Sequence, residues 1–531
     1  MRRGWRRRGR GAEARRSRRG APRAAGAFAR IRASAMPEVG ASSPDMRPSD
    51  HPSRTRRTAS TRIAAAAACV ALAGSALADW NALGGNPGKN GLAPGVGPAT
   101  PDLRWQGGRP SIIAWHPVIE GDRMFVVRQT GFVPNGVPNE APVVCQDVTS
   151  GQELWVANVP YNGGDWTTVV FGVRNGRVYA GRSGNGSSVN AKLHCLDAAT
   201  GATLWTSAQV IGTGAYDGIA FTEDGDPVVA TNQYLRRISA VDGSTVWNVT
   251  RNCSVSGDCG PSLHGNAVYV DEVAPGGQII TRFDATTGAR LYSSAVMPGF
   301  LAQSTPLVSP SGSVVYYNRI QNNGAVDFMY AWLDTGSAFQ FLWKEPSGYT
   351  PSGTFACRAG DSVFMVGPLK TVQHRDAMTG ALLAESDAIS TTPSAPSQVH
   401  MAVDAAGNLF VSNGEFPTGA VWCMHPVGGP TARLVTLWSA AVPNVNQGGP
   451  ALASDGTLIV CGVGTDIRAW QVPQCQPADL DCNGAVNGAD LGLLIGHWGA
   501  CPPGGPCVGD INGDGQVNGA DLGLLIGAWG P

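Results

Sequence analysis

The chain has 531 residues, enough for more than one domain, and its 39 lysines and arginines equal its 39 aspartates and glutamates. Residues 1–62 hold 18 of the basic residues and only four of the acidic ones, so the rest of the chain carries 21 basic against 35 acidic residues, a net charge of −14. Such a charge repels nucleic acid and anionic membrane surfaces, which argues against both as partners. Beyond the leader, no stretch of 18 apolar residues occurs, so the sequence predicts no membrane span.

Residues 1–54 are expected to form no folded structure. They are rich in arginine and show no apolar periodicity. One interpretation is a disordered arm that binds nucleic acid. The interpretation we favour is an over-extended gene start, with the true initiator at Met36 or Met46.

Residues 55–78 have the layout of a signal peptide. Basic residues up to Arg62 precede an apolar run from Ile63 to Ala73, and an Ala-x-Ala site follows at residues 76–78. Cleavage after Ala78 would release a protein that is secreted or displayed at the cell surface.

Between residues 79 and 473 one motif returns along the chain, and its clearest copy runs from Leu196 to Trp205. In each copy a strand is expected to end at an Asp, a Gly to take the positive φ of the turn, and a strand carrying a Trp to follow and pack between repeats. Seven copies end 41 to 54 residues apart, at Trp155, Trp205, Trp247, Tyr292, Trp343, Ala384 and Trp438. This spacing suits one four-stranded blade of a β-propeller.

A second series of two-residue turns interleaves with the first and has eight members. They are Gly121-Asp122, Asn175-Gly176, Asp224-Gly225, Gly265-Asn266, Ser311-Gly312, Ala359-Gly360, Ala406-Gly407 and Asp455-Gly456. We therefore predict a mainly β fold with an eight-bladed β-propeller over residues 79–473. The eighth blade, which ends at Trp470, lacks an outer strand, and we expect Leu103 to Trp105 to supply it and close the ring.

These repeats, together with the opening from Asp79 to Pro87 and Asn90-Gly91, resemble the pyrroloquinoline-quinone-like repeat family. The family includes quinoprotein dehydrogenases and a lipoprotein propeller of outer-membrane assembly. The resemblance implies the fold and not the cofactor. Quinoprotein dehydrogenases carry adjacent cysteines and a carboxylate base with a calcium ion, but this chain has no Cys-Cys pair. Its histidines, His264 and His400 among them, are interpreted as surface or interblade residues, and no catalytic or cofactor-binding residue is predicted.

Eleven cysteines remain after the leader is removed, and export permits disulfides. Cys253 with Cys259, and Cys501 with Cys507, flank short turn-forming segments, and we predict a disulfide for each pair. Cys145 and Cys195 occupy one position in successive repeats and are interpreted as buried free thiols.

Residues 474–531 form a separate domain with two copies of one segment, 31 residues apart. Each copy is a twelve-position calcium loop, with side-chain oxygens at positions one, three, five, nine and twelve, Gly at position six and a backbone carbonyl at position seven. The predicted ligands are Asp479, Asp481, Asn483, Ala485, Asn487 and Asp490 in the first loop, and Asp510, Asn512, Asp514, Gln516, Asn518 and Asp521 in the second. Ala485 and Gln516 would contribute carbonyls, and calcium is the expected cofactor at both sites.

The paired loops, each followed by Leu-Gly-Leu-Leu-Ile-Gly, resemble type I dockerin repeats, which also end the loop in Asp. The resemblance implies a small α-helical domain that binds a cohesin partner. Loop positions ten and eleven are Gly488-Ala489 and Gly519-Ala520, without the hydroxyls usual in dockerins. The alternative is a calcium-stapled C-terminal cap or surface-retention tag.

Two classes of function are consistent with the sequence. The first is a non-catalytic exported propeller that acts as a binding or scaffold platform for a glycan or protein ligand and is attached to an extracellular or cell-surface assembly through the dockerin-like domain. The second is an enzyme component, either a quinone-dependent dehydrogenase or part of a polysaccharide-degrading (glycoside hydrolase) complex. We favour the first.

Overall fold

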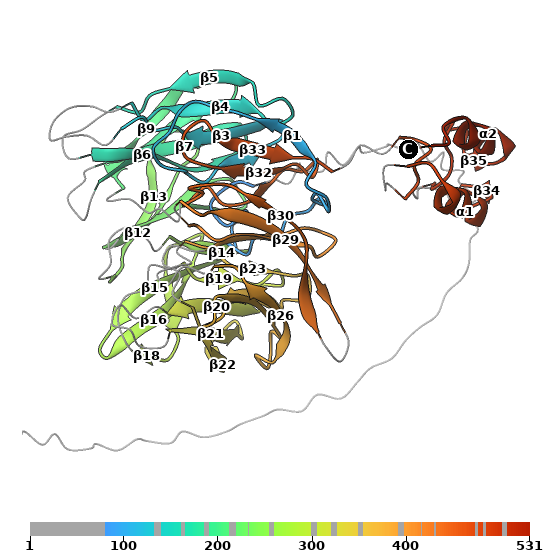
Figure 1. Cartoon of the computed structure of the whole chain (residues 1–531). Helices are drawn as coiled ribbons and strands as arrows, with labels where there is room; N and C mark the ends of the chain where they lie inside the picture. Colours follow the sequence, from blue (N-terminus) through green and yellow to red (C-terminus); the bar gives the residue numbers. More distant parts are fainter. Residues whose placement is uncertain are drawn as a thin grey trace, which may run out of the picture. The chain divides into compact units, whose positions relative to one another are not determined.

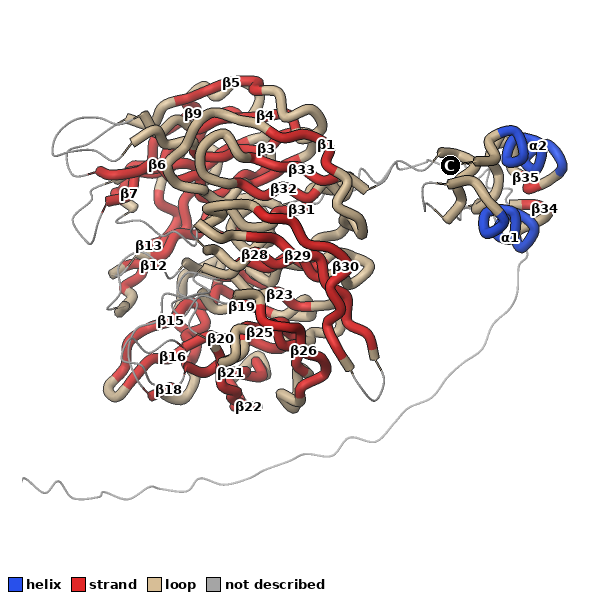
Figure 2. The backbone as a smooth tube through the Cα atoms, in the orientation of Figure 1, coloured by secondary structure: helices blue, strands red, loops and turns tan. Residues whose placement is uncertain are grey.

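The structure is a computed structural model, and strands dominate the part of the chain that it describes (Figures 1 and 2). Two helices occur in that part, α1 (Gly488–Gly496) and α2 (Gly519–Gly527). The prediction of a mainly β protein is confirmed. The described residues are 80–131, 140–160, 165–184, 191–211, 219–231, 233–253, 260–298, 305–319, 327–348, 354–390, 398–415, 417–428, 432–472, 476–481, 485–501 and 507–530.

The leader of residues 1–54 and the signal peptide of residues 55–78 lie outside the described residues and remain predictions. So does the Cys253–Cys259 disulfide, because Cys259 is outside them as well. Within the described part of the chain, no helix has the length and apolarity needed to cross a membrane.

The strands of the first half of the chain form antiparallel sheets in sequence order. The first sheet contains β2 (Val118–Glu120), β3 (Arg123–Val127), β4 (Val143–Asp147) and β5 (Glu153–Ala157). The second contains β6 (Asp165–Arg174), β7 (Arg177–Gly184), β8 (Lys192–Asp197) and β9 (Thr203–Val210). The third contains β10 (Ala220–Phe221), β11 (Pro227–Ala230), β12 (Tyr234–Ile238) and β13 (Thr245–Thr250). The fourth contains β14 (Ser262–His264), β15 (Ala267–Ala274), β16 (Gly277–Asp284) and β17 (Arg290–Ser293), with β18 (Met297–Pro298) also paired to β16.

The second half repeats the same order. The fifth sheet contains β19 (Leu307–Val308), β20 (Val314–Arg319), β21 (Asp327–Asp334) and β22 (Phe339–Ser347). The next set is β23 (Ala356–Cys357), β24 (Val363–Val366), β25 (Thr371–Arg375) and β26 (Leu382–Ala388). It is joined by one parallel pair, Glu385 with Arg433, to β27 (His400–Val403), β28 (Leu409–Ser412), β29 (Ala420–Val427) and β30 (Arg433–Ala441). The last set is β31 (Ala451–Leu452), β32 (Leu458–Cys461), β33 (Ile467–Trp470) and β1 (Leu103–Gln106).

The core lies around the inner strands of these sets. The second strands β24, β28 and β32 are buried along their whole length, whereas outer strands such as β5 and β30 alternate between exposed and buried residues. First strands of several neighbouring sets contact one another, and β2 of the first set contacts β31 of the last. Inner strands are therefore covered on both faces, which accounts for their continuous apolar sequence.

The motif tryptophans pack between successive sets, as the sequence predicts. The indole of Trp155 in β5 donates a hydrogen bond from Nε1 to the carbonyl of Ala198 at 3.0 Å, in the turn of the next set. Its ring covers Gly201, whose φ is +73°, so closely that a Cβ there would lie 2.6 Å from the ring. The same two contacts recur for Trp105 with Val148 and Gly151, Trp205 with Ala240 and Gly243, Trp247 with Ala285 and Gly288, and Trp343 with Ala377 and Gly380.

The predicted pairing of the N-terminal strand with the last strand of the repeats is confirmed. Strand β1 pairs antiparallel with β33, and Leu103 lies opposite Trp470. Trp105 then makes, toward the first set, the contacts that every other motif Trp makes toward the set after it. The outer strand of the last set is thus supplied from the other end of the chain.

The segment Trp80–Ala93, which we call the axial segment, follows the first strands of the sets in order. It has no regular secondary structure, yet its backbone or side chains bond to the first strands, or a residue beside them, in seven successive sets. The partners in sequence order are Ile119, Val173, Ile219, Leu263, Val308, Cys357 and Val403, at 2.7 to 3.2 Å. The axial segment therefore satisfies the inward edges of these strands, which a bare sheet edge would leave unpaired.

Candidate calcium-binding loops

The two predicted calcium loops each end at the start of a helix. In the first, Asn487 is the N-cap of α1, and its side chain accepts from the backbone N–H of Ala489 at 2.9 Å. Asp490, in the first turn, accepts in return from the backbone N–H of Asn487 at 2.8 Å. Asn518 and Asp521 form the same capping box at the start of α2. The side chains expected at positions nine and twelve of each loop are therefore held by the helix that follows.

The first loop brings its three carboxylates together. Oxygen atoms of Asp479, Asp481 and Asp490 all lie within 4.8 Å of one another. Asp479 and Asp490 are buried, whereas Asp481 is exposed. Three carboxylates at this separation repel one another unless a cation or several N–H donors compensate them, and hard oxygen ligands are those that Ca²⁺ prefers. The fifth position, Asn483, lies outside the described residues.

Asp490 is ionised although it is fully buried. Burial alone raises the pKa of this carboxyl group, but backbone N–H donors, among them those of Asn487 and Asp481, outweigh it and leave the pKa below its usual value. The pKa of Asp521 is lowered for the same reason, with Asn518, Asn512 and Ile511 as donors. The last carboxylate of each loop is thus preorganised in its charged form.

The second loop is arranged differently, since its carboxylates do not gather as those of the first loop do. Asp510 accepts from the backbone N–H groups of Asp514 at 3.1 Å and Gly515 at 2.9 Å. Asp514 in turn accepts from the side-chain amides of Asn512 and Asn518. Loop donors therefore occupy the oxygens that the sequence assigns to calcium.

The predicted carbonyl ligands are also placed. The carbonyl of Ala485 accepts from the side-chain amide of Asn487 at 2.9 Å, so this oxygen points toward the loop's own polar groups. Gln516 is exposed and lies in the short strand β35 (Gln516–Val517). The sequence spacing placed all these oxygens in two loops, but it could not show which of them already accept hydrogen bonds.

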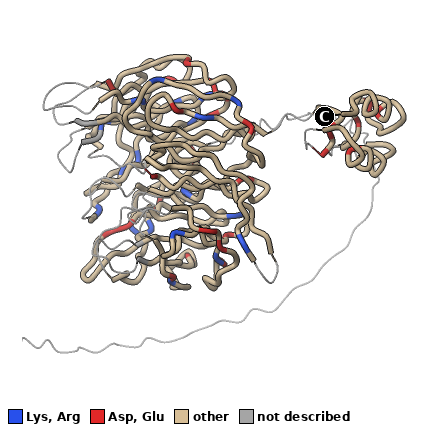
Figure 3. Tube along the Cα trace, viewed as in Figure 1, with Lys and Arg blue, Asp and Glu red and all other residues tan. Residues whose placement is uncertain are grey.

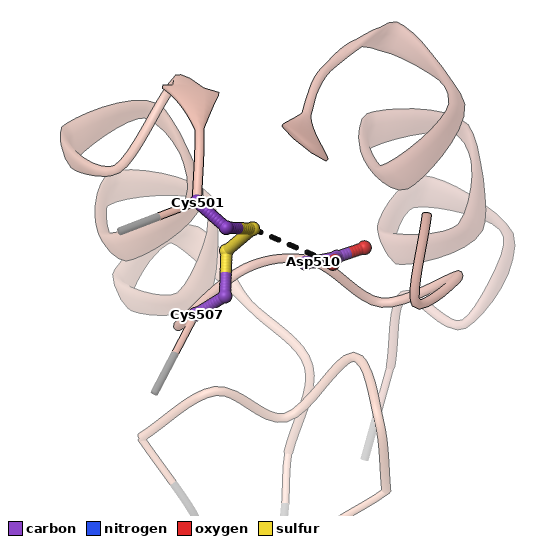
Figure 4. A group of neighbouring side chains, drawn as sticks. All are labelled: Cys501, Cys507 and Asp510. Atoms are coloured by element: carbon purple, nitrogen blue, oxygen red, sulfur yellow. Dashed lines mark hydrogen bonds between the residues drawn. A yellow bond between two sulfur atoms is a disulfide. The ribbon is translucent and has the colours of Figure 1, made fainter. Parts of the chain in front are cut away.

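A disulfide joins Cys501 to Cys507, with 5.3 Å between their Cα atoms, and confirms that predicted pair (Figure 4). The Sγ of Cys501 lies 3.5 Å from a carboxylate oxygen of Asp510. A disulfide sulfur carries no proton to donate, so this is a packing contact and not a hydrogen bond. Because metals bind the thiolate form of cysteine, the Cys501, Cys507 and Asp510 group is not a metal site while the disulfide is intact.

The two copies are tied to each other by a reciprocal exchange. Val486, at position eight of the first loop, pairs with Gly530 after α2, and Val517, at position eight of the second, pairs with Gly499 of β34 (Gly499–Ala500) after α1. Both members of each pair differ by the repeat offset of 31. Leu494 and Leu525, also 31 apart, are the fully buried residues of the small core. The two loops are therefore related by a local pseudo-twofold arrangement.

The buried thiols predicted at Cys145 and Cys195 are confirmed, and burial raises the pKa of each to about 12. The histidine interpretation is corrected in part. His264 is exposed as expected, but His400 is fully buried in β27, with its ring centroid 5.8 Å from that of His116. Its burial had no signal in the sequence, because the axial segment and two distant strands enclose it.

Comparison with known proteins adds to this geometry. Residues 139–383 match the family described as outer membrane protein assembly factor BamB. These are PQQ-like repeats. They coincide with sheets whose turns carry the Asp-Gly and Trp positions described above. No curated protein sequence matches the chain.

Solved structures similar to the PQQ-like repeat region include BamB from Moraxella catarrhalis, 16% identical over 65% of this chain and 100% of that chain, with a TM-score of 0.43. Quinohemoprotein alcohol dehydrogenase from Comamonas testosteroni is 12% identical over 77% of this chain and 84% of that chain, with a TM-score of 0.49. The Dos1 propeller is 11% identical over 71% and 94%, with a TM-score of 0.47.

Proposed function

We propose that this protein is a non-catalytic exported binding platform, an eight-bladed propeller attached to an extracellular or cell-surface assembly through a calcium-dependent dockerin-like domain. The eight sets of four described strands support the propeller. The observation that carries the attachment is the meeting of Asp479, Asp481 and Asp490 within 4.8 Å in a duplicated loop of calcium-binding sequence.

The attachment partner is proposed to be a cohesin-like protein. Each helix leaves an aliphatic residue and a following Trp exposed, Ile495 with Trp498 and Ile526 with Trp529. These pairs are again 31 residues apart, so the two copies offer equivalent apolar surfaces to a partner. Trp is enriched at the energetic centres of protein interfaces, whereas a calcium-stapled cap gives no reason to expose it.

The alternative of a quinone-dependent dehydrogenase has little support from the described residues. The quinone of that enzyme class carries several carboxylates and needs cationic side chains that are free to pair with them. Lys89 of the axial segment donates to the carbonyl of Ile219 at 2.8 Å, and Arg128 donates to the carbonyls of Arg109, Gly462 and Gly464. These buried cations are committed to the backbone, so the residues present do not fit the quinone. The glycoside hydrolase alternative rests on the dockerin resemblance alone.

Calcium binding to the full chain tests the proposal. We expect equilibrium dialysis with radioactive calcium to give two ions per chain, and Asp479→Asn with Asp490→Asn to remove one of them. Asp387→Asn, which removes an exposed carboxylate of the propeller, is the matched control and should leave the count unchanged. A full chain that binds no calcium at millimolar concentration would exclude the proposed mode of attachment.

A further inference from the structure

A cavity of about 700 Å³ lies between the axial segment and four inner turns of the propeller. The turns are those that join the first and second strands of the fourth to seventh sets, and they contribute Gly265, Pro310, Ala359 and Gly407. The volume falls in the range of about 300 to 1,000 Å³ that is usual for small-molecule sites. The calcium loops contribute nothing to this cavity.

The wall of the cavity is largely apolar. Pro87 and Leu92 come from the axial segment, and Leu263, Pro310 and Val403 come from the sheets. Three of the five are fixed by backbone bonds between the segment and the sheets, since Leu263 N donates to Pro87 and Val403 pairs with Leu92. The cavity is therefore preformed by the path of the axial segment.

One cation lines this apolar wall without a counter-ion. The guanidinium of Arg358 lies over Gly407, where a Cβ would come within 2.3 Å of Nη2, so only Gly leaves room for it. The side chain is half-buried, and the guanidinium makes no hydrogen bond or ion pair with any of the described residues. An arginine keeps its charge in such a place, and a partly desolvated charge gains most from a planar anionic partner.

The carboxylate that also lines the cavity is committed elsewhere. Asp404 is buried and accepts from the backbone N–H of Gly97 at 2.9 Å, and from the backbone and side chain of Asn408 at 2.7 and 2.9 Å. Its charge is thereby delocalised into three donors. His264, exposed with its ring over Gly312, adds a second polar group to the cavity rim.

We propose that this cavity binds an organic carboxylate with an apolar body, whose carboxylate pairs with Arg358 and whose apolar part fills the space against Leu92, Leu263 and Val403. The site extends the proposed platform role of the propeller to a class of ligand, and it rests on the cavity and not on the calcium loops. A free organic acid and the C-terminus of a peptide share this chemistry.

Titration of the full chain with N-acetyl-leucine, N-acetyl-leucinamide and the peptide acetyl-Ala-Ala-Leu, followed by saturation-transfer NMR and calorimetry, tests the site. We expect N-acetyl-leucine to bind with a Kd of the order of millimolar for its size, and the amide, which has the same shape without the charge, about tenfold or more weakly. Tighter binding of the peptide would identify a chain terminus as the ligand, and equal binding would identify the free acid.

Two variants complete the test. Arg358→Met keeps the length of the side chain and should weaken N-acetyl-leucine binding about tenfold or more. Arg433→Gln removes an exposed arginine paired with Asp387 outside the cavity and should leave binding unchanged. Equal affinity for acid and amide, an unchanged affinity in Arg358→Met, or no saturable binding of the acid would each overturn the proposal. The calcium count is measured separately, so failure here is distinguishable from failure of the attachment.

Discussion

Trp155 and Gly201 show how a single residue pair sets the spacing between neighbouring sets of strands. The indole needs the flat surface that a residue without Cβ provides, and the positive φ of the turn needs Gly as well. Both requirements can be predicted from the sequence, because the Gly and the Trp recur at a fixed distance. The turn Asp adds local hydrogen bonds, and hydroxyl and backbone donors from Thr200 lower the pKa of Asp197.

A comparison of two glycines separates the role of the indole from that of φ. Gly201 and Gly336 have φ of +73° and +84°, but a Cβ at Gly336 meets nothing within 4 Å. We expect Gly336→Ala to cost about 1 to 2 kcal/mol through backbone strain alone, and Gly201→Ala to cost about 1 to 3 kcal/mol more through the clash with Trp155. Thermal unfolding of the two variants measures the difference, and equal losses would show that the indole contact adds nothing.

His400 makes the stability of the propeller depend on pH. Burial lowers the pKa of His400 to about 4, and burial followed by the charges of His400 and Lys89 lowers that of His116. Because the folded-state pKa lies below the unfolded value of about 6.5, the unfolded chain binds the proton more tightly. Stability should therefore fall as the pH drops from about 6.5 to about 4, by up to about 1.4 kcal/mol per pH unit from His400.

His400→Gln tests this dependence through its slope. The variant should lose part of the decrease in melting temperature between pH 6.5 and pH 4, whatever its stability at neutral pH. His425→Gln, which changes a partly exposed histidine of β29, is the control and should keep the slope of the parent. A His400→Gln profile parallel to that of the parent would contradict the account. Sequence reasoning missed this site, because residues 116 and 400 meet only through the tertiary fold.

At the scale of elements, the pairing of β1 with β33 was predictable and the path of the axial segment was not. The first follows from counting repeats, because one outer strand was missing and Trp105 carried the motif. The second involves a segment of glycines and asparagines without apolar periodicity, so no pattern indicates which strands it meets. The cavity beside it, with Arg358, was unpredictable for the same reason.

Deletion of residues 79–108 removes both elements. The inward edges of seven first strands and the edge of β33 would then lose their partners. Exposed strand edges pair with other chains, so we expect the truncated protein to aggregate and to lose its cooperative thermal transition. Size-exclusion chromatography with light scattering measures this. A monomeric truncated protein with the melting temperature of the parent would show that neither element is needed for closure.

At the scale of the whole molecule, two parts differ in what stabilises them. The propeller buries large apolar clusters, whereas the C-terminal domain of fewer than 60 residues has a core of five buried residues, Ala478, Val486, Leu494, Val517 and Leu525. So small a core is marginal alone. Charged side chains are scattered over the propeller, but the C-terminal domain concentrates acidic ones in its loops (Figure 3). Its stability should therefore depend on a cation.

Calorimetry of the full chain in calcium and in chelator tests this central claim most directly. At a thousandfold excess over Kd, each bound ion adds about 4 kcal/mol to a domain of marginal stability. We predict that the transition of the C-terminal domain appears only with calcium, that Asp510→Ala with Asp521→Ala lowers it, and that the propeller transition does not move. Identical thermograms in calcium and in chelator would contradict the account.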